Sequence, residues 1–135
     1  MKYYLDSCIW VDYFEERKDS KNNIGEFAFQ LLCRLVASNE KIIISSFLFR
    51  ELEAVYSVEK LRAMTLPFEK VIERVDFTDE QFNTAKEIAL KRELPKGDVL
   101  HALIAKENNA VLVTRDKHFQ LLKDICIVMK PEEII

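Results

Sequence analysis

The chain has 135 residues, of which 49% are hydrophobic and 32% charged, so one soluble globular domain is expected over residues 1–135. Two glycines and three prolines are too few for a collagen-like or low-complexity chain, and they argue against an all-β sandwich with its many tight turns. The net charge of −3 excludes a protein that holds nucleic acid mainly by bulk positive charge, so a polyanion would need a local patch or a bound metal.

Four short apolar runs have the length of β-strands. They are continuous rather than alternating in polarity, which is typical of strands buried on both faces of a parallel sheet. The runs are Tyr3–Leu5, Ile42–Ile44, Val111–Val113 and Ile125–Val128. Val71–Phe77 mixes apolar and charged residues and is a candidate edge strand.

Helical periodicity fills most of the chain between these runs. The polar run Glu15–Asn23 predicts a loop, and Thr78 and Asp79 are candidate caps at the start of one helix. Apolar residues at helical spacing predict helices through Ile24–Leu35, Leu48–Val55, Phe82–Ala89 and, after a break at Pro95–Gly97, Val99–Lys106. The alternation of strands and helices predicts a three-layer α/β/α fold with a four- to five-stranded parallel central sheet.

Four acids fall where the predicted strands end or the following helices begin. Asp6 ends the first strand, and Asp116 follows the Val111 strand after two residues. Glu51 and Asp98 lie near the starts of two helices. Because ligands of open parallel sheets bind beyond the carboxyl ends of the strands, we expect these four carboxylates to share one site.

Each acid also has a simpler structural interpretation. Asp98 and Asp116 could cap helices, but Asp6 closes a buried strand, where a carboxylate is costly unless something compensates its charge. Glu53 competes with Glu51 for the same role. It points about 200° away around the helix, and Glu51 is favoured because it borders the apolar stripe.

Four carboxylates in one cleft repel one another and raise one another's pKa values. A hard divalent cation relieves that repulsion, and oxygen ligands suit Mg²⁺ or Mn²⁺. No cluster of cysteines and histidines competes for zinc. Such a metal ion lowers the pKa of a bound water and neutralises a phosphate, so the pattern points to phosphodiester hydrolysis.

The residues around these acids resemble the PIN-domain ribonucleases, and most closely the toxin subunits of VapBC toxin–antitoxin pairs. The resemblance runs from the first strand to the last and is specific in its combination of motifs. These are Tyr4-Leu5-Asp6-Ser7, Arg50-Glu51-Leu52, Asp98-Val99-Leu100-His101-Ala102 and Val113-Thr114-Arg115-Asp116-Lys117-His118-Phe119.

The resemblance implies a metal-dependent endoribonuclease that cuts RNA with Mg²⁺ or Mn²⁺, through Asp6, Glu51, Asp98 and Asp116 as metal-binding and catalytic acids. It implies that Thr114, and with it Ser7, orients the site. It also implies a homodimer and, for the toxin type, a small antitoxin that enters the active-site groove.

Basic residues close in sequence to these acids are candidate phosphate contacts, although each is equally consistent with a solvated basic rim. They are Arg50, Lys96, Arg115 and Lys117. Arg115 stands where asparagine is common in the family, and this departure is expected to affect substrate contact rather than metal binding.

Several conspicuous residues have structural interpretations. His101 is expected to pack or hydrogen-bond locally, and His118 to be exposed. Trp10, in a first helix that is apolar nearly all round, fits either the core or a contact with a dimer partner or antitoxin. The three cysteines, Cys8, Cys33 and Cys126, are expected as free thiols in apolar surroundings.

No signal peptide or membrane-spanning segment is evident, so a cytoplasmic protein is expected. A signalling receiver domain has a similar length and sheet, but it needs an acidic pair after its first strand, and Asp6 is followed by Ser7. The sequence leaves open a housekeeping RNA-processing nuclease without an antitoxin. It also leaves open, at lower rank, a non-catalytic RNA- or partner-binding module.

Overall fold

The computed structural model describes residues 1–135, which fold around a five-stranded parallel sheet of strand order β3-β2-β1-β4-β5. The three-layer α/β prediction is therefore confirmed. The strands are β1 (Lys2–Leu5), β2 (Lys41–Ser45), β3 (Ile72–Val75), β4 (Ala110–Val113) and β5 (Val128–Met129). The three central strands are almost wholly buried, whereas β3, at one edge, is only half-buried, as its mixed composition predicts.

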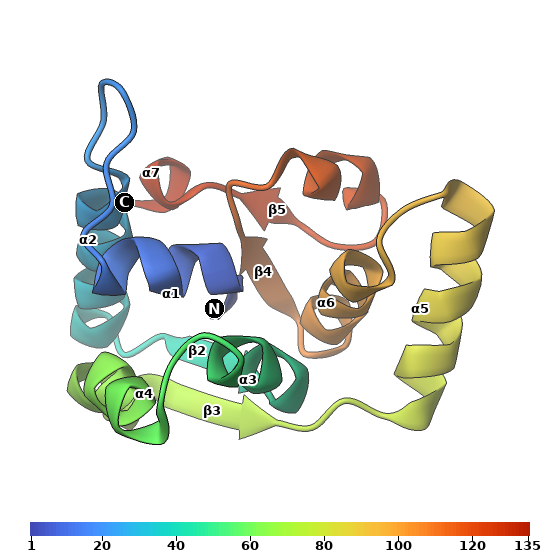
Figure 1. The fold of residues 1–135 in the computed structure, drawn as a ribbon, viewed down its shortest axis with the longest axis horizontal. Coiled ribbons are helices and arrows are strands. Elements are labelled where there is room, and N and C mark those ends of the chain that lie inside the picture. Colours follow the sequence, from blue (N-terminus) through green and yellow to red (C-terminus); the bar gives the residue numbers. More distant parts are fainter.

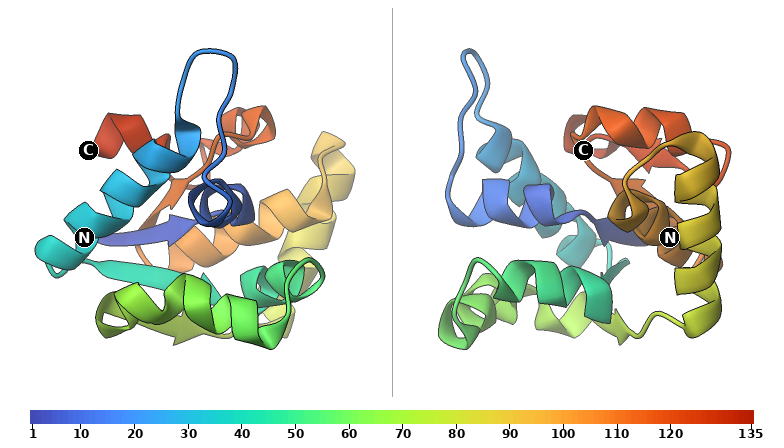
Figure 2. Two further views of the ribbon diagram at one scale, coloured as in Figure 1. Left: turned by 60° about the vertical axis from the view of Figure 1, so that its left-hand side comes forward. Right: turned by 45° about the vertical axis from the view of Figure 1, so that its right-hand side comes forward.

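Helices cover both faces of the sheet (Figure 1). The helix α2 lies on one side of the sheet and the packed pair α5 and α6 on the other, and both views of Figure 2 show the sheet between them. The α-helices are α1 (Ser7–Phe14), α2 (Ile24–Ala37), α3 (Ser46–Glu53), α4 (Val58–Thr65), α5 (Asp79–Arg92), α6 (Lys96–Glu107) and α7 (Pro131–Ile134), and the 3₁₀ helices are η1 (Leu66–Val71) and η2 (Lys117–Leu122).

Local sequence signals explain where the helices begin. Thr78 caps α5 through a capping box, in which its hydroxyl accepts from the Gln81 backbone and the Gln81 side chain accepts from the Thr78 backbone. Ser45, the last residue of β2, caps α3, because its hydroxyl accepts from the backbone N–H of Leu48. On α2 the predicted apolar stripe is fully buried from Ala28 to Leu35, whereas Ile24 at its start is only partly buried.

The chain order of the strands determines where a ligand can bind. From β1 the chain moves to β2 and β3, and then crosses back to β4 on the other side of β1. This reversal opens a crevice at the carboxyl end of β1, flanked by the ends of β2 and β4. Asp6 lies at this point, directly after β1.

The first helix belongs to the core. Ile9 and Trp10 are fully buried, so Trp10 is not available for a contact with another chain. Tyr13 stacks on Phe29, which is partly exposed. The predicted loop after α1 projects from the body of the molecule in both views of Figure 2.

Two predicted boundaries are wrong. The last strand does not span Ile125–Val128, because the backbone N–H groups of Ile125 and Cys126 still bond to Leu122 in the turn after η2. Val55 does not continue α3, which ends at Glu53, and its side chain is exposed.

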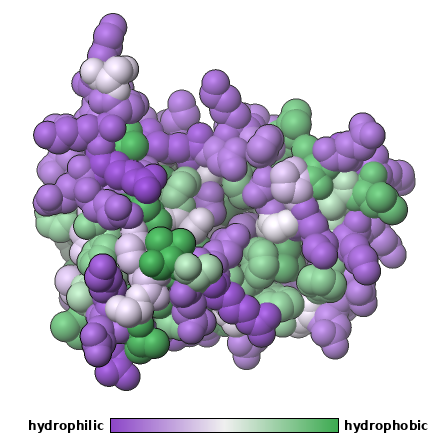
Figure 3. Space-filling model, in the orientation of Figure 1, coloured by the Kyte–Doolittle hydropathy of each residue, from purple (hydrophilic) through white to green (hydrophobic).

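The surface seen in Figure 3 is mainly hydrophilic, with hydrophobic residues in small separate groups. None of the helices combines the length and the apolar character needed to cross a membrane.

Candidate functional site

Asp6 is held by hydrogen bonds to both of its carboxylate oxygens. Its Oδ1 accepts from the backbone N–H of Ser7 at 2.8 Å, where Asp6 caps α1, and its Oδ2 accepts from the Thr114 hydroxyl at 2.9 Å. The side chain is buried, so these donors replace water around the charge. The orientation of Asp6 is therefore fixed by the fold.

Thr114 links Asp6 to Asp116. The same hydroxyl that donates to Asp6 accepts from the backbone N–H of Asp116 at 3.0 Å. The pairing of β1 with β4 brings these segments together, and Thr114 directly follows β4. Asp116 also caps η2 by accepting from the backbone N–H of His118. The sequence suggests this capping role beside the expected role in the site.

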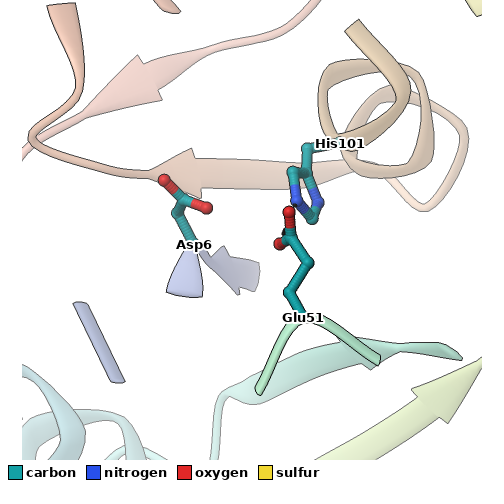
Figure 4. A group of neighbouring side chains, drawn as sticks. All are labelled: Asp6, Glu51 and His101. Atoms are coloured by element: carbon teal, nitrogen blue, oxygen red, sulfur yellow. Dashed lines mark hydrogen bonds and ion pairs between the residues drawn. The ribbon is translucent and has the colours of Figure 1, made fainter. Parts of the chain in front are cut away.

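Glu51 on α3 and His101 on α6 face one another across the crevice (Figure 4), with 2.7 Å between Oε1 and Nε2. A carboxylate only accepts, so His101 donates from Nε2, and in the neutral ring Nδ1 accepts from the Tyr4 hydroxyl at 2.6 Å. Tyr4 in turn meets Ser45 Oγ at 2.7 Å. This buried chain fixes the ring that holds Glu51.

Asp98 stands in the first turn of α6 and is partly buried. Burial, together with the negative charges of Asp116 and Asp6, raises the pKa of Asp98. The like charges that act on Asp98 come from two strand ends, so the repulsion expected from the sequence acts on this carboxylate.

All four predicted acids line one cavity of about 390 Å³. The cavity lies where α1, α3, α6 and the start of η2 meet. Its lining residues are Asp6, Ser7, Cys8, Asp12, Ile24, Glu51, Asp98, His101, Arg115 and Asp116. Glu53, the rival of Glu51, is exposed and lines a different cavity with Arg50.

The donor set suits a divalent cation. Carboxylate oxygens and imidazole nitrogens form two candidate ligand groups, one of Asp6, Glu51 and His101 and the other of Asp98, Asp116 and His118. The only thiol in the cavity belongs to Cys8, whose pKa burial and the Asp6 charge raise to about 12. Neither ligand group contains this thiol, so the donor set does not match the cysteine-rich set of a structural zinc site.

Among the four predicted phosphate-binding residues, only Arg115 lines the cavity. Its guanidinium forms two hydrogen bonds to Glu132 on α7, of 2.8 and 3.0 Å, and lies 3.7 Å from buried Asp12. Arg115 is therefore anchored in the cavity wall. The other three are exposed: Arg50 lies over the Phe77 ring, Lys96 lies over the Phe82 ring, and Lys117 makes no ion pair.

Sequence reasoning missed two site contacts. The sequence predicts that His101 packs or hydrogen-bonds locally, but its partners Tyr4 and Glu51 are distant in sequence. The three-residue spacing from Asp98, which puts both on one helix face, is the signal that could have indicated it. His118 is exposed as expected, yet its ring lies beside Asp98 and Asp116.

All three cysteines are free thiols, as expected, but only Cys126 is buried in the apolar core. Cys33 is exposed on α2. Cys8 lies beside polar groups, because its position as the second residue of α1 puts Sγ 3.5 Å from Asp6 Oδ2 and 3.6 Å from Thr114 Oγ1.

A protein-family model described as PIN domain matches residues 3–125. A comparison with curated protein sequences finds no match. Three similar solved structures, all from bacteria, are below 25% identity and show a shared fold.

The chain is similar to VapBC2 from Rickettsia felis bound to a DNA fragment from their promoter, at 23% identity over 95% of this chain and 97% of that chain, with a TM-score of 0.69. It is also similar to FitAcB from Neisseria gonorrhoeae, at 17% identity over 98% of this chain and 99% of that chain, with a TM-score of 0.65. A third similar structure is VapBC-1 from nontypeable Haemophilus influenzae, at 22% identity over 98% of this chain and 99% of that chain, with a TM-score of 0.65.

Proposed function

Because the chain belongs to the PIN-domain family, whose members are nucleases, we propose that it is a metal-dependent endoribonuclease and the toxin of a toxin–antitoxin pair. The observation that carries the proposal is the meeting of Asp6, Glu51, Asp98 and Asp116, from four separate elements, in one cavity. Structural caps alone do not require four acids to share a cavity in which their charges repel.

The proposed metal ligands are these four carboxylates, with Mg²⁺ or Mn²⁺ as the cation. When bound, the metal ion supplies a water of lowered pKa and a positive charge for the scissile phosphate. The raised pKa of Asp98 supports this assignment, because a cation between the acids removes the repulsion that Asp116 and Asp6 exert.

The protein's own groups have distinct roles in the proposed reaction. Thr114 and the backbone of Ser7 fix the two oxygens of Asp6, so that its lone pairs toward the cavity keep one direction. His101 holds Glu51 in place by a hydrogen bond. Glu51 then serves either as a further metal ligand or as the base that accepts the proton of the attacking water. The activated water would attack the phosphorus in line, and the bond from phosphorus to the leaving oxygen would break as that oxygen takes a proton from solvent.

RNA is the proposed substrate, bound by local basic groups because the net charge of the chain is negative. Arg115 lines the cavity wall and is the foremost candidate for a phosphate contact. Arg50, Lys96 and Lys117 are exposed and serve as candidates along the strand on either side of the cut.

The likeness to VapBC and FitAcB assemblies supports an antitoxin partner for this chain. A homodimer and a cytoplasmic location belong to the same proposal, as does a single nuclease domain over residues 1–135. A small antitoxin that fills the acidic cavity would block RNA and metal together.

A cleavage assay tests the proposal. The purified chain is incubated with a labelled structured RNA in Mg²⁺, Mn²⁺ or EDTA, beside Asp6→Asn, Asp98→Asn and a control, Asp124→Asn. Asp124 is an exposed acid outside the cavity, paired with Arg92. Metal-dependent cleavage that both site variants lose and the control keeps is the expected result.

Other outcomes point to the alternatives. Cleavage without growth arrest on expression would favour a housekeeping nuclease over a toxin. Metal binding by a folded protein that cuts none of a panel of RNAs would favour a non-catalytic binding module.

A further inference from the structure

The two histidines of the chain both lie beside acids of the cavity, but the His101 side chain is buried and the His118 side chain is exposed. His118 Nδ1 lies 3.2 Å from Asp116 Oδ1 and 3.5 Å from Asp98 Oδ2. Two ligands at about 2.1 Å from one metal ion are separated by about 3 Å at right angles and somewhat more in a tetrahedron. The ring nitrogen is therefore already near ligand spacing from both acids, and the three side chains offer ligand atoms that all lie within 4.8 Å of one another.

His101 does not have this freedom. It is buried, and its two ring nitrogens are engaged by Tyr4 and Glu51. It can ligate a cation only by giving up one of these bonds, which makes it a positioning residue for Glu51. The side chain of His118 is 58% exposed, and its two ion-pair partners are both proposed metal ligands.

The position of His118 is built into the fold. Asp116 caps η2 by accepting from the backbone N–H of His118 at 2.9 Å, and the next residue, Phe119, is buried in the core. The cap on one side and the apolar anchor on the other hold the His118 backbone against the two acids. Its exposed ring needs only a rotation about its own bonds to follow a cation.

We propose that His118 is a nitrogen ligand, with Asp98 and Asp116, of the divalent cation in the proposed nuclease centre. The inference rests on the proposed function and deepens it by addressing the choice of metal. Mg²⁺ keeps an oxygen environment, whereas a nitrogen donor favours a transition ion. The centre therefore prefers Mn²⁺ to Mg²⁺.

Pulsed electron paramagnetic resonance on the Mn²⁺-loaded protein tests this directly, because a directly bound imidazole gives a ¹⁴N modulation of the Mn²⁺ signal. The variant His118→Gln keeps a polar side chain without the ring, and Gln120→Ala, on the same 3₁₀ helix, is the control. The wild type and the control should show the ¹⁴N modulation, and His118→Gln should lose it. Calorimetric titration should show Mn²⁺ affinity falling about 10-fold or more in that variant, with a smaller change for Mg²⁺.

Absence of the modulation in the wild type, or its persistence in His118→Gln, overturns the assignment. If such a protein still binds Mn²⁺ and cuts RNA, the nuclease proposal stands and His118 is only a counter-charge to the acids. If the wild type binds no Mn²⁺ at all, both the assignment and the nuclease proposal fail.

Discussion

Thr114 has no charge, yet it is the residue through which two of the acids are connected. Its hydroxyl donates to Asp6 and accepts from the backbone of Asp116. Thr114→Val keeps the shape but removes both bonds, so RNA cleavage should fall roughly 10–100-fold, the usual effect of losing an outer partner of a metal ligand. Thr114→Ser keeps the hydroxyl and should retain most activity. Activity that is kept in Thr114→Val but lost in Thr114→Ser would show that packing of the methyl group, not the hydroxyl, matters.

Glu51 and Glu53 form a matched pair, two residues apart on α3. Glu51 lines the acidic cavity and bonds to His101, while Glu53 is exposed and faces another cavity. Glu51→Gln should lower kcat about 100-fold or more, the scale of a lost acid–base group or metal ligand. Glu53→Gln should leave kcat unchanged. Steady-state cleavage kinetics of the two variants decide the point, and a larger loss in Glu53→Gln would contradict the assignment.

At the scale of elements, α5 supports the site indirectly, because it packs on α6, which carries Asp98 and His101. Thr78→Ala removes the cap of α5 and should lower the free energy of unfolding by about 1 kcal/mol in a urea titration. Thr84→Ala, inside the same helix, should not destabilise, since alanine favours helix. Cleavage should be normal in both variants, and an effect confined to Thr84→Ala would contradict the cap.

The same elements show what a sequence can predict. Continuous apolar runs identify β1, β2 and β4 because all three strands are buried, and parallel pairing then brings their terminal acids to one edge. Local rules fail at β5, where an apolar run continues through a turn. They also do not show that the Arg115 guanidinium pairs with Glu132, because that contact depends on where α7 returns to the sheet.

Over the whole molecule, the acidic cavity is a source of instability without metal. Burial and the charges of Asp116 and Asp6 raise the pKa of Asp98, so the folded protein holds this proton more tightly than the unfolded chain, whose value is near 3.8. Asp98 therefore favours folding below that value, and the contribution is lost as pH rises through the higher folded pKa.

Asp98→Asn removes this pH-dependent loss. In EDTA at pH 7 the variant should melt about 2–4 °C above the wild type, corresponding to a gain of about 1 kcal/mol. The gap should shrink as pH falls toward about 4. In excess Mn²⁺ the order should reverse, since only the wild type keeps the full set of ligands and gains binding energy. A melting temperature that is lower than the wild type in EDTA would contradict the charge repulsion.

The central claim is that Asp6, Glu51, Asp98 and Asp116 hold one metal centre. Anomalous diffraction at the manganese edge, from crystals soaked in MnCl₂, tests it most directly. We expect a manganese peak inside the cavity, bonded to oxygens of Asp6 and Asp98. A protein that cuts RNA with its manganese bound elsewhere, or with none in the cavity, would contradict it.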